Sequence, residues 1–175
     1  MKSSRATGGQ TSGSVLSFRD RFATSPQFAA LYEEGMALVE ETAEYLDRAG
    51  RMESKRLRPP ASLAYTSESI KLTTRLTQLA SWLLVRRAIA LGEITFAEAN
   101  NHRHRVTLAA QSRLRPEGYS TLPETFKGLI EHSHRLHDRI LRLDRLLNDG
   151  YSSAEQSDSA VLPQIERIRL AFPAA

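Results

Sequence analysis

The apolar residues of this chain recur at helical spacing in three long stretches, and the most apolar stretch lies near the centre. There the side chains first follow one stripe, formed by Ile70, Leu72, Leu76, Leu79 and Leu83. From residue 79 onward, further apolar residues spread around most of the helix: Ala80, Trp82, Leu84, Val85, Ala88 and Ile89. A helix that is buried on one side needs an apolar arc of only ~100°. The pattern predicts a helix over residues 62–91 that packs in its own core and also contacts a partner through Trp82, Leu83 and Leu84.

An earlier helix is predicted to begin at Ser25-Pro26, a capping residue followed by proline at the first helical position, and to end at Gly50. Its core face holds residues at helical spacing: Phe28, Leu31, Tyr32, Leu38, Val39, Thr42, Tyr45 and Leu46. Its other face is acidic: Glu33, Glu34, Glu40, Glu41, Glu44 and Asp47. General acid–base catalysis needs a carboxylate with a shifted pKa in a dry cleft. We therefore interpret the adjacent glutamates as a solvated helix face.

The last long helix has the most regular spacing, in alternating steps of four and three. The positions are Leu122, Phe126, Leu129, Ser133, Leu136, Ile140, Leu143 and Leu147. Such a heptad seam packs at a shallow angle along its length. The motif Thr121-Leu-Pro-Glu124 reads as a capping box at its start, and Asp149-Gly150 is predicted to end it. A similar box at Thr95–Glu98 predicts a short helix that fades near residue 113.

These elements predict an all-α fold: a bundle of three long antiparallel helices, with a shorter helix between the second and third and disordered termini. The expected parts are a disordered segment (1–24), a bundle domain (25–149) and a flexible tail (150–175). Four apolar residues in the tail can form one stripe of a short helix: Leu162, Ile165, Ile168 and Phe172. A helix this short is marginal alone in water. We interpret it either as a docking peptide that folds in a partner's groove or as a tail resting on its own bundle.

Composition narrows the possible functions. The 175 residues include no cysteine, which excludes disulfides, thiol nucleophiles and cysteine metal sites. No apolar run approaches the ~20 residues of a membrane span, and the N-terminus lacks the apolar core of a signal peptide. We expect a cytoplasmic protein with no membrane contact. The net charge of +4 is spread along the chain, so direct nucleic-acid binding is not predicted.

Two polar clusters are candidates for binding. His134 and His137 are three residues apart beside Asp138, which suits a metal only with ligands from elsewhere. Because His134 falls off the heptad seam and His137 beside it, we interpret both as a solvated helix face; His102 and His104 receive the same interpretation. No catalytic, cofactor-binding or metal-binding residue is predicted. A basic cluster, Lys55, Arg56 and Arg58, precedes two prolines and reads as a solvated linker or as a contact surface for an acidic partner.

Four segments together resemble the alphaproteobacterial family of RcdA, the regulator of CtrA degradation. They are LYEEGMALVEETAEYLD (31–47), ESKRL (53–57), residues 65–95 and LPETFKGLIEHSHRLHDRILRLDRLL (122–147), and LTTRLTQLASWLL (72–84) is the most specific part. The resemblance implies a three-helix bundle, a homodimer and a non-enzymatic adaptor without cofactors. The adaptor would deliver cell-cycle regulatory proteins, transcription factors among them, to the ClpXP protease.

The resemblance also implies partners beyond the protease. The protein would work with the response-regulator adaptor CpdR and with a second-messenger effector protein, and it would be recruited to a cell pole. Independently, the apolar surface of residues 76–91 favours a homodimer, since it exceeds what two neighbouring helices can cover. The alternatives are a small helical ligand-binding protein, an enzyme with an unrecognised site, and a DNA-associated regulator.

Overall fold

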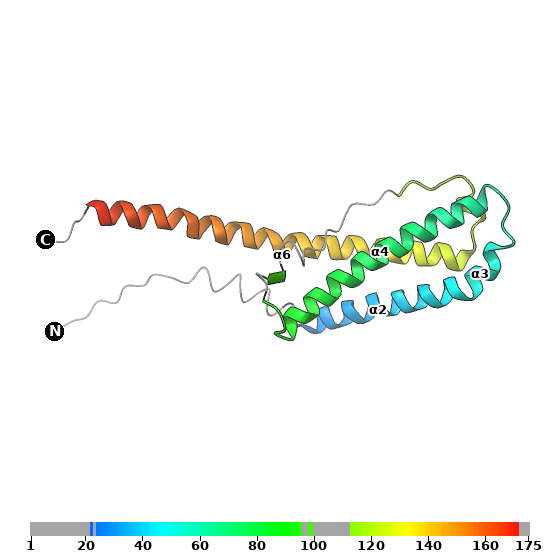
Figure 1. Cartoon of the computed structure of the whole chain (residues 1–175), viewed down its shortest axis with the longest axis horizontal. Helices are drawn as coiled ribbons and strands as arrows, with labels where there is room; N and C mark the ends of the chain where they lie inside the picture. Colours follow the sequence, from blue (N-terminus) through cyan, green and yellow to red (C-terminus); the bar gives the residue numbers. More distant parts are fainter. Residues whose placement is uncertain (1–21, 23, 96–97, 100–112, 172–175) are drawn as a thin grey trace. The chain divides into compact units, whose positions relative to one another are not determined.

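The computed structural model describes residues 22, 24–95, 98–99 and 113–171, and every regular element in these ranges is helical. The elements are α2 (Pro26–Asp47), α3 (Ala49–Ser54), α4 (Ala61–Ala90), a 3-10 turn η1 (Tyr119–Thr121) and α6 (Glu124–Ala171). The chain divides into two compact units. One comprises residues 22–141, where α2, α4 and the first part of α6 lie alongside one another (Figure 1). The described part of the other, residues 142–171, is helical. The predicted all-α class is confirmed.

Helix α2 begins where the sequence predicts. The Ser25 hydroxyl accepts a hydrogen bond from the Phe28 backbone N–H at 3.2 Å, and Pro26 takes the first helical position, where its missing N–H costs nothing. The predicted core face is confirmed at Phe28, Leu31, Leu38, Thr42 and Tyr45, which are all buried.

The predicted stop at Gly50 is wrong. The break falls two residues earlier, at Arg48 (φ −112°, ψ −92°), and Gly50 lies inside the short helix α3, where it is buried. A Cβ on Gly50 would come within 2.5 Å of the Tyr65 hydroxyl and 2.9 Å of the Tyr45 carbonyl oxygen. Glycine is needed here because two aromatic residues press against its backbone, and not because the helix ends.

The central helix is observed as Ala61–Ala90, against the predicted 62–91. Gly92 ends it in the left-handed conformation (φ +71°). The N–H groups of Gly92 and Glu93 bond the carbonyls of Ile89 and Ala88 at 3.0 and 2.9 Å, the paired bonds of a Schellman motif. Within this helix Leu72, Leu76, Leu79 and Leu83 are buried as predicted, whereas Ile70 is 64% exposed and was wrongly assigned to the core stripe.

Helix α6 supplies the third wall of the unit that spans residues 22–141. Its seam residues are buried as predicted from Leu122 to Ile140, and Phe126 stacks against Tyr45 and lies against Tyr65 (centroids 5.9 and 4.5 Å apart). The helix starts at Glu124, so Thr121 belongs to the 3-10 turn and is not its N-cap.

The predicted end of this helix at Gly150 and the irregular stretch after it are wrong, because α6 continues to Ala171. A glycine inside a helix costs only ~1 kcal/mol, and it ends a helix when it adopts a positive φ, as Gly92 does. Among the described glycines only Gly92 and Gly118 do so. Pro163 lies well inside α6, although proline is normally tolerated only in the first turn of a helix. No separate docking helix begins near residue 161.

The segment that joins α4 to η1 is described only in part. The capping box at Thr95 is confirmed: the Thr95 N–H donates to the Glu98 carboxylate (2.7 Å), and the Glu98 N–H donates to the Thr95 hydroxyl (3.2 Å). The rest of the predicted short helix, with His102 and His104, lies outside the described residues.

Candidate protein-binding surface

One face of α4 is exposed, long and free of charged residues. We call it the α4 outer stripe; it comprises Leu63, Thr66, Ile70, Thr73, Thr77, Ser81, Leu84, Ala88 and Leu91. Its large apolar members recur seven or fourteen residues apart, and they are the exposed large apolar residues of α4 and its C-cap: Leu63 70%, Ile70 64%, Leu84 49% and Leu91 62%. Since α4 has 30 residues, the stripe is ~45 Å long.

The hydroxyl groups on this face bond to the helix itself. Thr66, Thr73 and Thr77 donate to the carbonyl oxygens four residues earlier at 3.1, 2.8 and 2.9 Å, and Ser81 donates to Thr77 at 2.8 Å. This pattern satisfies the hydroxyl donors within the helix. The threonine methyl groups therefore contribute apolar surface between the leucines, and the stripe is less polar than its composition suggests.

The other helices of this unit present charged faces. The exposed face of α2 carries Glu33, Glu40, Glu41 and Glu44, and that of α6 carries Arg135 and Arg139. On α4 the one exposed residue with a charge is Arg87, and its guanidinium lies over the Tyr32 ring of α2, 4.6 Å from the centroid. An exposed apolar strip in an otherwise charged surface is typical of a protein-interaction site.

Two of the three residues predicted to form this surface belong to the core. Trp82 is 2% exposed and Leu83 0%, whereas Leu84 lies on the outer stripe. Trp82 instead packs inward, with the Arg86 guanidinium 5.1 Å from its ring centroid. Of the predicted contact residues only Leu84 therefore lies on the exposed face, which includes threonines that a hydrophobicity pattern counts as polar. Binding of a partner there stays a prediction.

The other predicted contact residues lie elsewhere. Lys55, Arg56 and Arg58 are exposed in the connection between α3 and α4. Leu84 is 23 residues after the start of α4, ~35 Å along the helix, so the basic cluster and Leu84 do not form one site. Leu162, Ile165 and Ile168 lie in α6 within the other unit, and Phe172 lies outside the described residues.

A buried polar layer between α4 and α6 was not predicted. Arg75 is 1% exposed and its Nη1 donates to the Ser133 hydroxyl at 2.6 Å. Glu68, two turns earlier on the same face of α4, is 5% exposed and pairs with Lys71 at 2.8 Å. Burial lowers the pKa of Arg75, though an arginine stays charged at neutral pH. Residue type gives no warning of this layer, since arginine and glutamate are usually on the surface.

The interpretation of His134 and His137 as a solvated face is wrong, since they are only 8% and 3% exposed. The buried arc of α6 is wider than its leucine seam, and His134 lines a cavity together with residues of α4 and of the segment before η1. Burial, reinforced by the charges of Arg75 and Arg113, lowers the pKa of His134 to about 4. Within the described residues no three His, Cys, Asp or Glu side chains are grouped to hold a metal ion.

A polar cluster joins α2 to α6. Glu34 accepts from Arg139 and lies 3.1 Å from His132 Nε2. Partial burial opposes ionisation of Glu34, but the hydrogen bonds from Arg139 and His132 outweigh it and lower the pKa of the carboxyl. This residue of the predicted acidic face therefore links two helices, whereas Glu33, Glu40 and Glu41 are exposed as expected.

No helix in the described ranges is long and apolar enough to cross a membrane. A model of the family described as protein of unknown function (DUF1465) matches residues 19–172. None of the curated proteins matches the chain. Among solved structures, the crystal structure of RcdA from Caulobacter crescentus CB15 is 44% identical, with a TM-score of 0.60, covering 73% of this chain and 96% of that one. The resemblance to RcdA found in the sequence is confirmed: the chain belongs to the DUF1465 family and is an RcdA-like protein.

Proposed function

We propose that this chain is a non-enzymatic adaptor that delivers cell-cycle regulatory proteins to the ClpXP protease, together with a response-regulator adaptor. The observation that supports this best is the α4 outer stripe, a long uncharged face on a domain whose other helices carry charged ones. An adaptor acts by contact alone, so it needs such a surface. Because the chain is 44% identical to RcdA, contacts with the ClpXP protease and with a response regulator are the ones to test first.

We further propose that the stripe serves as the seam of a homodimer. A strip ~45 Å long and ~10 Å wide covers ~450 Å² on each protomer, so a pair of stripes buries ~900 Å². Stable interfaces bury ~1,200–2,000 Å² in total. The stripe alone falls below that range, and the dimer is therefore expected to dissociate on dilution, which would free the same face for a cargo protein.

Affinity purification from cells that make the protein tests this proposal. The bait would be the full chain, compared with Leu84→Glu, which places a charge in the stripe, and with Ala43→Glu, which places the same charge on an exposed position of α2. We expect the protease and the response regulator to co-purify with the unchanged chain and with Ala43→Glu. Recovery of neither protein with the unchanged chain would contradict the adaptor role, and equal recovery of cargo with Leu84→Glu would contradict the role of the stripe.

A further inference from the structure

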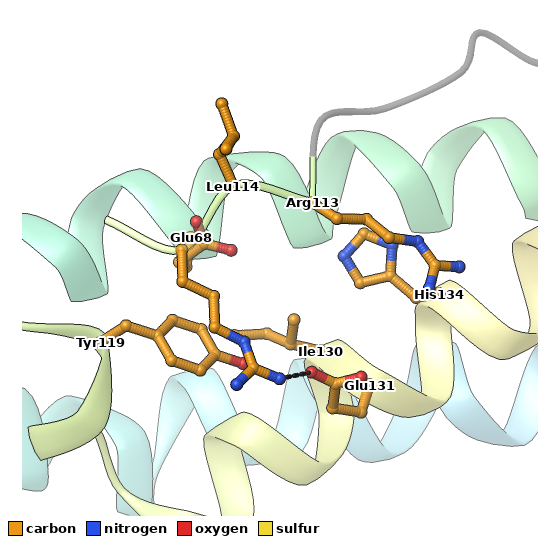
Figure 2. A pocket seen from close by; sticks show the side chains of 8 residues that line it. Glu68, Arg113, Leu114, Tyr119, Ile130, Glu131 and His134 are labelled. Carbon is orange, nitrogen blue, oxygen red and sulfur yellow. Dashed lines mark hydrogen bonds and ion pairs between the residues drawn. The ribbon is translucent and has the colours of Figure 1, made fainter. Parts of the chain in front are cut away.

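A cavity of about 100 Å³ opens in the unit that spans residues 22–141, between α4, α6 and the segment before η1 (Figure 2). Its walls are mostly polar and include charges of both signs. The lining residues are Glu68, Arg113, Leu114, Arg115, Tyr119, Ile130, Glu131 and His134. Three kinds of N–H or O–H donor therefore reach the cavity: two guanidinium groups, one imidazole and one phenol.

The charges around the cavity do not balance. Each carboxylate there has its own cation: Glu68 pairs with Lys71 (2.8 Å), Glu131 with Arg115 (2.9 Å), and Asp138 with Arg113. The dashed line in Figure 2 marks the pair with Glu131. Arg75 is the cation that remains: within the described residues no acidic side chain forms an ion pair with it, although the charges of Glu68, Asp138 and Glu131 act on it from a longer distance.

Arg75 does not line the cavity, but its charge acts on two residues that do, His134 and Tyr119. The Ser133 hydroxyl that holds its Nη1 is adjacent in the chain to His134 in the wall, and Glu68, seven residues before Arg75, lines the cavity from the same face of α4. The Nε and Nη2 atoms of Arg75 are buried without a hydrogen-bond partner. These two atoms form the edge with which arginine binds carboxylate or phosphate in a bidentate manner. A buried cation with an unused edge favours an anion nearby.

We propose that this cavity binds a small oxyanion, a phosphate or carboxylate group, whose charge is offset by Arg75 and which hydrogen-bonds to Arg113, Arg115 and Tyr119. The two rim arginines are more than half exposed, at 58% and 65%, and exposed ion pairs contribute little. Each guanidinium has five N–H donors, so each can keep its carboxylate partner and still donate to a ligand. His134 is neutral at pH 7, so its ring adds one N–H donor without a further charge. This site is independent of the adaptor role and of the α4 outer stripe.

NMR titration of the full chain with inorganic phosphate, at constant ionic strength set by chloride, tests the proposal. We expect saturable shifts of the amides of residues 113–119 and 130–134, with a Kd in the millimolar range or tighter. Parallel titrations with O-phosphoserine and with acetate distinguish free phosphate, a phosphate ester and a carboxylate as the preferred source. Shifts that grow linearly with all three anions would overturn the proposal.

Variants decide whether the charges behind and beside the cavity matter. Arg75→Met keeps the bulk of the side chain and removes its charge, and should weaken binding at least tenfold. Arg135→Met removes an exposed arginine from the outer face of α6 and should leave the Kd unchanged. Should Arg75→Met fail to fold, Arg113→Gln at the rim replaces it, with a weakening of at least threefold expected. Unchanged phosphate affinity in the variant that folds would refute the site.

Discussion

The two partners of the buried hydrogen bond between Arg75 and Ser133 should differ in how much their removal destabilises the fold. Ser133→Ala deletes the hydroxyl that Arg75 Nη1 contacts at 2.6 Å, and since Nε and Nη2 already lack partners, the buried guanidinium is left without a side-chain acceptor. A hydrogen bond to a charged group contributes ~1.5–3 kcal/mol, and a buried donor that loses its partner costs at least that much. We expect Ser133→Ala to reduce the free energy of unfolding by ~2–3 kcal/mol.

Arg75→Met should be much milder. The Ser133 hydroxyl also donates to the Ile130 carbonyl at 2.7 Å, so removal of the guanidinium leaves that hydroxyl satisfied. Replacing a buried ionic group by an apolar one of similar volume is often neutral or stabilising. We expect a change within ~1 kcal/mol, and a double variant close to Arg75→Met alone.

Urea denaturation of the two single variants and the double variant measures these values, provided that the slopes with denaturant agree. Ser133→Ala should also melt ~5–10 °C lower than the unchanged chain. The opposite result would be an unchanged free energy of unfolding in Ser133→Ala and a loss of more than ~2 kcal/mol in Arg75→Met. It would show that Arg75 stabilises the fold through contacts of its own and that its Nε and Nη2 atoms have partners.

Further predictions concern packing, pH and assembly. Gly50→Ala should destabilise the fold by ~1–3 kcal/mol, because its Cβ would meet backbone and two tyrosines. Gly128→Ala should stabilise the fold by ~0.5–1 kcal/mol, because its Cβ would meet nothing within 4 Å on an exposed helix position. Urea denaturation compares the two variants, and equal effects would contradict the packing around Gly50. The pKa of His134 is lower in the folded state than in the unfolded chain, so the free energy of unfolding should fall by ~3 kcal/mol as the pH drops from about 6.5 towards 4. His134→Gln should remove this dependence on pH, and an unchanged slope would refute the assignment. Leu84→Glu should be monomeric by light scattering at concentrations where the unchanged chain is partly dimeric. If the variant and the unchanged chain formed dimers to the same extent at the same concentration, the α4 outer stripe would be excluded as the dimer interface.

The sequence was most informative where a structural signal is local. The caps at Ser25-Pro26 and Gly92 depend on bonds within one turn of the helix; α2 begins at the predicted residue, and both ends of α4 lie within one residue of the predicted 62–91. The leucines of α4 and α6 at helical spacing identified most of the core, because burial of one face follows from the helical period.

It was least informative where neighbouring elements decide. Gly50 sits in a helix because two tyrosines exclude a Cβ, which no local pattern reveals. Arg75 of α4 and His134 of α6 are buried because these two helices pack against each other there, which the residue types alone do not reveal. The outer stripe was missed in detail because threonines that bond their own helix act as apolar residues.

The proposed delivery of proteins to ClpXP is tested most directly by a degradation rate. Proteins that co-purify with the chain would be incubated with purified ClpXP and ATP, with and without the chain and the response regulator. We expect degradation to accelerate at least tenfold only when the chain is present, and we expect Leu84→Glu to lose this effect while Ala43→Glu keeps it. Equal degradation rates with and without the chain, for every protein recovered with it, would exclude the adaptor role.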